Sequence, residues 1–346
     1  MNPTEAEEEA VLAALEERRT RINEAIDEDL PVADPERLYE ASRYLLEAGG
    51  KRLRPAMTLL VGEALVDTEA DTVDYRSFPT LDGERIDLLK AALSIEIIQS
   101  FTLIHDDILD DDEMRRGVPA VHKAFDLETA ILAGDTLYSK SFEEMLATGA
   151  QTHRSLDALQ LLAQTCTKIC EGQSMDIEFE SATEVSIEEY QQMIELKTAV
   201  LFKAAAAVPG ILLGASEETI AALGRYGLAV GEGFQIHDDV LDLTVPSDKL
   251  GKHRGSDLIE GKRTLITIHA EASGVDIDAI RPTSPDDAEA IDNAVNTLET
   301  AGSIEFARNR ARELVDIGTA ELDVLPDNES RRLLEDLAYY LVEREY

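Results

Sequence analysis

The sequence of 346 residues contains no tryptophan, only two cysteines and few basic residues. Cys166 and Cys170 lie four residues apart in one predicted helix, so we expect free thiols and a reducing cytoplasm. The first residues lack the basic and apolar regions of a signal peptide. The longest run of small apolar residues, 204–214, contains Pro209 and is too short to span a bilayer. We therefore expect a soluble protein without stable membrane insertion.

Basic residues are greatly outnumbered, with 32 Lys and Arg against 71 Asp and Glu, for a net charge of −39. This charge argues against nucleic acid or an anionic membrane surface as the main partner. Only 10 of the basic residues are lysines, while 44% of the chain is hydrophobic and supports a sizeable core. An acidic, lysine-poor chain with a normal core is typical of adaptation to high salt, where a Debye length of about 3 Å at 1 M screens charge repulsion.

Helical periodicity dominates, and no convincing run of strand-like alternation is present. Segment 88–104 is apolar on nearly every face, which predicts a helix in the middle of the protein. A second helix is predicted to open with Pro55 at its first position. The segments 67–85 and 274–287 are rich in turn-forming residues and are predicted to be surface loops. We predict one all-α domain over 1–346 that begins with an acidic helix at 1–30, whose apolar stripe is Val11, Leu12, Leu15, Ile22 and Ile26.

A short acidic sequence occurs twice. Ile104-His-Asp-Asp-Ile-Leu-Asp110 recurs as Ile236-His-Asp-Asp-Val-Leu-Asp242. Most acidic runs are solvated helix faces, but these two follow apolar turns and oppose the helix dipole at predicted C-termini. Carboxylates without a cysteine or histidine cluster suit Mg²⁺, which combines one or two carboxylates with phosphate oxygens. The neighbouring His105 and His237 are expected to pack and to donate to carboxylates. Two facing boxes therefore predict Mg²⁺ ions around one diphosphate.

Clustered cations are conspicuous in so acidic a chain. Gly49-Gly-Lys-Arg-Leu-Arg54 places three cations on a glycine-rich loop at a helix N-terminus, which is typical of an anion site. Ion pairing with nearby acids is the alternative for any single cation. A P-loop is disfavoured because five residues separate Gly255 from Gly261 and Arg263 replaces the Ser or Thr of that motif. The other candidate cations are Arg115, Arg116, Lys197, Lys252 and Lys262.

These motifs together resemble the trans (E-type) polyprenyl diphosphate synthase family, and most closely its short-chain archaeal geranylgeranyl diphosphate synthases. The resemblance covers about residues 30–346. The motifs that carry it are GGKRLRP at 49–55, HDDILD with RRG within 105–117, AGD at 133–135, GQSMD at 172–176, KT at 197–198, FQIHDDVLD at 234–242 and GKHRGSDLIEGKRTL at 251–265.

The resemblance implies the isoprenoid synthase fold, a single-domain bundle of antiparallel helices around a central cavity, in a cytoplasmic homodimer. It implies head-to-tail condensation of isopentenyl diphosphate with dimethylallyl, geranyl or farnesyl diphosphate, release of diphosphate and the use of three Mg²⁺ ions. The implied product is C20, with C15 and C25 left open. A class I terpene cyclase is a rival, although the second box here is again DDxxD. A non-catalytic subunit is another, although all six box aspartates are intact.

The resemblance also implies roles for individual residues. The principal Mg²⁺ ligands would be Asp106, Asp110 and Asp238, supported by Asp107, Asp239 and Asp242. The allylic diphosphate would be held by Arg115, Lys197, Thr198, Gln235 and Lys252, with Lys262 a further substrate-binding residue. Isopentenyl diphosphate would be held by Lys51, Arg54, Gln99 and Arg116. The catalytic set would be Asp106, Asp110, Asp238, Lys197 and Lys252.

Product length is predicted to depend on Phe101 and Thr102, which precede the first box on the same helix. An aromatic residue followed by a small one is what the family pattern associates with C20. Met175 is expected in the core, and Asp176 is expected to be a polar partner of the site. The chain ends in Arg344, Glu345 and Tyr346 without the basic tail of many members, so the sequence leaves open whether its C-terminus contributes to the isopentenyl diphosphate site.

Overall fold

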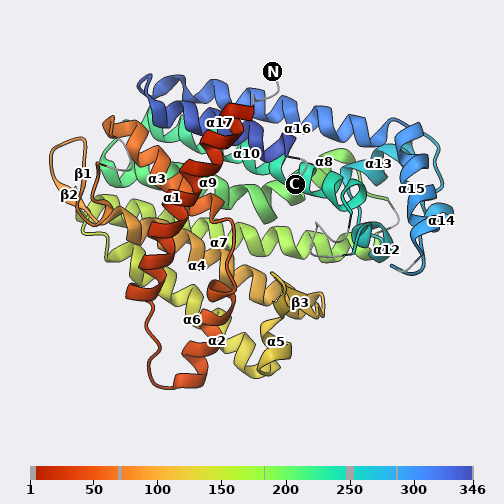
Figure 1. Cartoon of the computed structure of the whole chain (residues 1–346), viewed down its shortest axis with the longest axis horizontal. Coiled ribbons are helices and arrows are strands. Elements are labelled where there is room, and N and C mark those ends of the chain that lie inside the picture. The colour runs from red at the N-terminus through yellow and green to blue at the C-terminus, as the bar shows by residue number, and fades with distance from the viewer. Residues whose placement is uncertain (1–4, 69–71, 183, 247–252, 286, 345–346) are drawn as a thin grey trace.

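The computed structural model describes residues 5–68, 72–182, 184–246, 253–285 and 287–344, which form an all-α bundle as predicted (Figure 1). The long helices are α1 (Glu5–Asp29), α2 (Glu36–Glu47), α3 (Leu53–Val66), α4 (Leu88–Leu109), α6 (Leu127–Leu146), α7 (Thr152–Ser181), α9 (Val200–Leu213), α10 (Glu217–Thr244), α15 (Ala288–Thr300), α16 (Ser303–Ala320) and α17 (Glu329–Glu343). The shorter helices are α5 (Val121–Ala124), α8 (Ile187–Ile194), α12 (Ser256–Glu260), α13 (Leu265–Ala272) and α14 (Ile277–Ile280).

The remaining elements are short. Two turns of 3-10 helix are η1 (Tyr75–Ser77) and η3 (Glu321–Val324), and a π-helical turn, η2 (Glu195–Ala199), joins α8 to α9. Two antiparallel hairpins of two-residue strands complete the described chain: β1 (Phe78–Pro79) with β2 (Arg85–Ile86), and β3 (Met114–Arg115) with β4 (Val118–Pro119).

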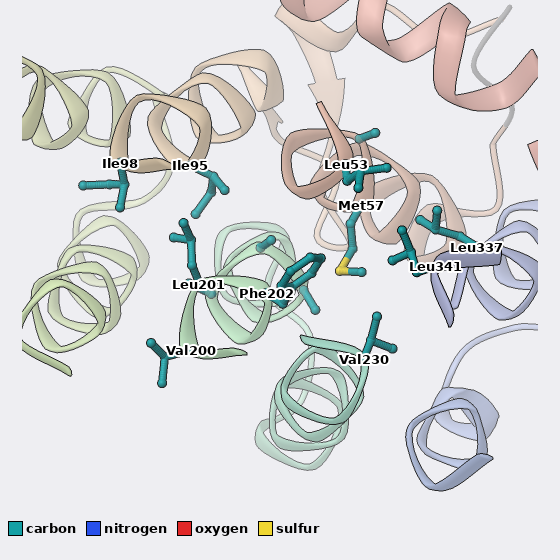
Figure 2. Packing of buried hydrophobic residues seen from close by; sticks show 14 of the residues in the cluster. Leu53, Met57, Ile95, Ile98, Val200, Leu201, Phe202, Val230, Leu337 and Leu341 are labelled. Carbon is teal, nitrogen blue, oxygen red and sulfur yellow. The ribbon is translucent and has the colours of Figure 1, made fainter. Parts of the chain in front are cut away.

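The centre of the bundle is formed by α4, α9 and α10. The helix predicted at 88–104 is confirmed as α4, whose side chains are buried on almost every face because it packs on α3, α6 and α9. α9 is rich in alanine and lies close against both α3 and α10. Figure 2 shows Met57 of α3, Phe202 of α9 and Val230 of α10 meeting Leu341 of α17 in this core.

The acidic N-terminal helix is present as α1, which packs against α3, α4 and α17. Its buried stripe is the predicted one at Val11, Leu15, Ile22 and Ile26. Leu12 was expected in that stripe, but it is 44% exposed. It directly follows Val11, and neighbouring residues on a helix point about 100° apart, so both cannot face one core.

The predicted surface loop at 67–85 is partly core. Phe78 is fully buried, and the Tyr75 hydroxyl donates to the buried Glu63 at 2.6 Å. The segment 274–287 likewise contains a helical turn, α14, with Ile277 buried. In both segments, a few apolar residues within a polar composition anchor the chain to the core.

Pro55 was predicted to be the first residue of its helix, but α3 already begins at Leu53.

Two helical stretches, Leu88–Leu109 and Ile187–Leu213, are long and apolar enough to cross a membrane by composition alone. In each, 72% of the apolar window is buried inside the bundle. Apolar surface that is already covered by protein is not available to lipid, so both stretches are explained as core helices.

Candidate active site

The two acidic boxes meet at one cavity of about 230 Å³. The first box ends α4, with Asp110 as its C-cap residue, and the second lies in the last turns of α10. Four box carboxylates line the cavity: Asp106, Asp110, Asp238 and Asp239. Five of the predicted phosphate-binding residues line it as well: Arg115, Lys197, Thr198, Gln235 and Lys262. The fold therefore brings together motifs that are more than a hundred residues apart in sequence.

The aspartates of the first box lie in two different environments. Asp106 faces the cavity, where burial raises its pKa to about 6 against the opposing effect of Lys197. Asp107 is fully buried and does not line the cavity; its Oδ1 accepts from Arg115 Nε at 2.6 Å. Arg115 also donates to Asp112 at 2.7 Å. Asp107 thus orients Arg115, one of the predicted phosphate-binding residues.

The second box is organised differently. Asp239 accepts from the Tyr190 hydroxyl at 2.6 Å and from Gln235 Nε2 at 2.9 Å. Burial, followed by repulsion from Asp257, raises the pKa of Asp239. Asp242 is fully buried outside the cavity lining, where it accepts from Ser256 Oγ at 2.8 Å and from the Asp257 backbone N–H at 3.2 Å. Asp242 therefore holds the start of α12 beside the cavity.

The cations of the cavity wall are held by acids rather than left free. Lys197 Nζ donates to Asp176 Oδ2 at 2.6 Å, which gives Asp176 the expected place beside the site. Burial opposes the Lys197 ammonium, but Asp176 and Asp106 outweigh it and raise the pKa. Lys262 lies 3.0 Å from Glu260, and its pKa is also raised because nearby carboxylates outweigh burial. Both lysines therefore stay charged at neutral pH.

A second group of cations lies near Asp238 but outside the cavity lining. Arg54 stacks over the Phe202 ring at 4.2 Å, and burial lowers its pKa to about 10. Arg344 stacks over Phe234 at 5.0 Å and donates to Asp238 Oδ1 at 3.4 Å. Desolvation and then repulsion from Arg344 lower the pKa of Lys51 to about 8. Lys51, Arg54 and Arg344 therefore form a cation group that we call the α3–α17 cluster.

Arg116, which is predicted to bind isopentenyl diphosphate, contacts the loop that carries Lys51. Its Nη1 donates to the backbone carbonyls of Leu45, at 3.1 Å, and Gly49. A Cβ at Gly50 would lie 2.9 Å from the Arg116 guanidinium carbon, so the loop fits closely against this side chain. Gln99 is half-buried on α4, two turns before Asp106.

The predicted chain-length residues lie below the first box. Phe101 packs edge-on against His105 and Tyr138, with ring centroids 5.3 Å apart in each pair. Thr102 is half-buried, and its hydroxyl donates to the Gln99 carbonyl at 2.9 Å. His105 and His237 pack as expected, but they contact the backbone carbonyls of Ile131 and Arg344 rather than carboxylates.

The donors fit Mg²⁺ better than a metal that needs a preformed protein cage. Among the residues that the structure describes, no three His, Cys, Asp or Glu side chains converge tightly enough to hold an ion by themselves. Mg²⁺ does not require this, because it keeps several waters and completes its shell with substrate phosphates. The four cavity carboxylates supply hard oxygen donors from two facing helices.

Some site residues were not predicted from sequence, and one predicted residue cannot be placed. Lys252 lies outside the described residues. Tyr190 and Arg344 were missed because neither belongs to a charged motif in the sequence. Asp257, which lines the cavity, lies in the GSDLIEGK motif but was given no role. Its position two residues after a glycine, in the first turn of a short helix, was the only available signal.

The chain was compared with known proteins. A family model described as polyprenyl synthetase matches residues 35–298. A geranylfarnesyl diphosphate synthase of Natronomonas pharaonis is 62% identical over 97% of this chain and 98% of that protein. A geranylgeranyl diphosphate synthase of Methanosarcina mazei is 46% identical over 96% of this chain and 97% of that protein.

Solved structures agree with these sequence matches. A geranylgeranyl pyrophosphate synthetase from Geoglobus acetivorans superimposes with a TM-score of 0.85 at 40% identity, covering 95% of this chain and 99% of that one. Both the resemblance inferred from the motifs and the isoprenoid synthase fold are thereby confirmed. The chain belongs to the polyprenyl synthetase family.

Proposed function

We propose that this trans-prenyltransferase condenses isopentenyl diphosphate with an allylic diphosphate head-to-tail, releases diphosphate and makes the C20 product. One observation carries the proposal: two aspartate boxes on facing helices line one cavity that also contains cations, and a second cation group lies near Asp238 outside the cavity lining. Two separate cation groups suit a reaction between two diphosphate substrates, whereas a class I terpene cyclase binds a single diphosphate substrate.

The allylic diphosphate is assigned to the cavity between the boxes. Arg115, Lys197 and Lys262 supply positive charge there, and Thr198 supplies a hydroxyl. Arginine can contact phosphate oxygens in pairs, while lysine acts as a point charge. Lys197 lies between Asp176 and the first box, so its ammonium is fixed in place before substrate arrives.

Mg²⁺ is proposed to be held by Asp106, Asp110, Asp238 and Asp239, with three ions per site as the family resemblance implies. When bound, it would neutralise charge that develops on the leaving diphosphate. The residues of this chain do the positioning: Tyr190 and Gln235 fix Asp239, and Asp107 fixes Arg115. No protein nucleophile is required, and we assign the final proton loss to the released diphosphate as base.

Isopentenyl diphosphate is assigned to the α3–α17 cluster. Lys51, Arg54 and Arg344 all lie near Asp238, and the two arginines stack on aromatic rings. The stacking holds each guanidinium by one face. The C-terminal end of α17 thus joins the site through one arginine.

The C25 product is a second candidate. A relative 62% identical to this chain is named a geranylfarnesyl diphosphate synthase, while others are named geranylgeranyl diphosphate synthases. Phe101 favours C20 because a bulky ring lies one turn and a half below Asp106, where a growing chain would pass. Each added C5 unit would gain about 4 kcal/mol by burial, so termination at C20 requires a steric block.

A cytoplasmic homodimer that works at high salt is also proposed. Large apolar side chains remain exposed along α6 and α7: Leu127, Ile131, Leu132, Tyr138, Leu146, Leu156 and Ile177. Exposed apolar residues gathered on two adjacent helices are typical of an interface, and a second copy of this chain is the proposed occupant. Light scattering in molar KCl tests this, and a monomer under those conditions would contradict it.

The direct test uses the purified chain in molar KCl with Mg²⁺, labelled isopentenyl diphosphate and each allylic primer. We expect incorporation of label, which a cyclase or a non-catalytic subunit would not give. Asp106→Ala and Asp238→Ala should lower turnover by orders of magnitude while leaving the chain folded. Asp111→Asn is the matched control, because Asp111 is an exposed acid beside the same box. Near-normal kinetics in either box variant would refute the assigned role of the boxes.

A further inference from the structure

Lys197 and Thr198 lie in the π-helical turn η2, which interrupts an otherwise continuous helix from α8 to α9. A π-turn is wider than an α-turn, and such turns are rare and frequent at functional sites. Both of these consecutive side chains line the same cavity. The wider turn must be held by its neighbours, because isolated π-helical hydrogen bonding is unfavourable.

On one side, α7 holds the turn with a glycine and an acid four residues apart. A Cβ at Gly172 would lie 2.7 Å from both Lys197 Cα and the Leu196 carbonyl carbon, so only glycine fits. One turn later on the same face, Asp176 accepts from Lys197 Nζ at 2.6 Å. The backbone and the ammonium of Lys197 are therefore both fixed by α7.

On the other side, α10 repeats the arrangement. A Cβ at Gly231 would lie 2.6 Å from Ala199 Cα. Four residues later, Gln235 Oε1 accepts from the Thr198 hydroxyl at 2.9 Å. Each flanking helix thus supplies a glycine against the backbone of the turn and a polar partner for one of its two functional side chains.

Neither glycine is required by its own backbone conformation. Both lie inside helices, and neither has a positive φ. Glycine in a helix interior is less favourable than alanine by about 0.5–1 kcal/mol, so close approach is the reason for its presence.

We propose that Gly172 and Gly231 are positioning residues for the allylic diphosphate subsite, which seat η2 so that Lys197 and Thr198 face the cavity together. This inference rests on the proposed function of those two residues. A methyl group at either glycine would push η2 and its flanking helix apart by roughly 1 Å, and a misplacement of that size can cost about 100-fold in rate.

The test compares Gly172→Ala and Gly231→Ala with Gly224→Ala. Gly224 lies on α10 as well, but a Cβ there would be 3.5 Å from its nearest neighbour, an ordinary contact. We expect the KM for the allylic substrate to rise at least tenfold in the first two variants. The KM for isopentenyl diphosphate should change less than twofold, and Gly224→Ala should match the parent. A merely structural role would lower the active fraction and leave both KM values unchanged, which would overturn the proposal.

A double-mutant comparison separates this inference from the proposed function. If Gly172 acts through Lys197, adding Gly172→Ala to Lys197→Ala should change the allylic KM less than twofold. Normal kinetics in Lys197→Ala would overturn the assigned role of Lys197 itself. An impaired Lys197→Ala beside a normal Gly172→Ala would overturn only the positioning role. If Gly172→Ala does not fold, Asp176→Asn tests how α7 positions Lys197 without adding volume to the packing. An unchanged allylic KM in Asp176→Asn would count against the proposal.

Discussion

Replacing Arg344 by glutamine should weaken isopentenyl diphosphate binding more than it weakens folding. The Arg344 guanidinium contacts Asp238 at the long distance of 3.4 Å; the Asp238 side chain is 46% exposed, whereas the Arg344 side chain is 5% exposed and stacks on Phe234. A long ion pair with a partly solvated partner adds little to folding, and glutamine keeps part of the buried side-chain packing. A charged hydrogen bond to a bound phosphate contributes about 1.5–3 kcal/mol, which corresponds to roughly a 10–100-fold rise in KM.

The same variant should shift a pH profile in a known direction. Lys51 has a pKa lowered to about 8 by desolvation and by the Arg344 cation. In the parent, kcat/KM for isopentenyl diphosphate should therefore fall as pH rises through about 8, because Lys51 loses its proton. Removing the Arg344 charge removes a repulsion, so the pKa of Lys51 should rise and the decline should move to higher pH.

Steady-state kinetics from pH 6.5 to 9.5 at constant molar salt would measure both effects. Arg332→Gln is the matched control, since Arg332 lies on the same helix and is paired with Asp327 at an exposed position. The allylic KM should stay within twofold of the parent in both variants. An isopentenyl diphosphate KM unchanged in Arg344→Gln, with the same pH profile, would refute the placement of Arg344 in that subsite.

Further predictions concern product length, a buried hydrogen bond and a buried carboxyl. Phe101→Ala should lengthen the products by at least one C5 unit, and an unchanged product ladder on thin-layer chromatography would rule out the steric block. Tyr190→Phe removes the 2.6 Å bond to buried Asp239 and should lower stability by about 1–3 kcal/mol in urea titrations; an unchanged midpoint would contradict this. Burial, helped by Glu195, raises the pKa of Glu232 to about 7. Because this folded pKa lies above the unfolded value, the parent loses stability as pH rises from about 4.5 to 7. Glu232→Gln should therefore raise the melting temperature near pH 8 and have no effect at pH 4.5, whereas an equal gain at both values would be inconsistent with the raised pKa.

Residues whose function depends on local sequence were predictable. The box aspartates and the Lys197-Thr198 pair form short motifs, and the charge contrast with an acidic chain makes the cations visible. The burial of α4 followed from apolar residues on nearly all of its faces. Periodicity could not decide that Leu12 is exposed, because adjacent apolar residues fit the same pattern until a neighbouring helix is placed.

Roles within a motif were not predictable from the motif. Asp107 and Asp239 occupy the same position in the two boxes, yet Asp107 accepts from Arg115 outside the cavity lining, whereas Asp239 accepts from Tyr190 and lines the cavity. Which carboxylate faces the cavity depends on the rotation of α4 and α10 against their neighbours. The repeated sequence is symmetric, but the surroundings of its two copies are not.

The sequence by itself determined an all-α chain, two oxygen-donor boxes and a set of cations predicted to bind phosphate, because composition, helical periodicity and motif spacing are local properties. Only the tertiary structure decided that Arg344 joins Lys51 beside Asp238, and that Gly172 and Gly231 close on the π-turn from two sides. These contacts join residues far apart in the chain. They exist only after the apolar faces of α7, α9, α10 and α17 have packed together, which fixes distances that no local pattern encodes.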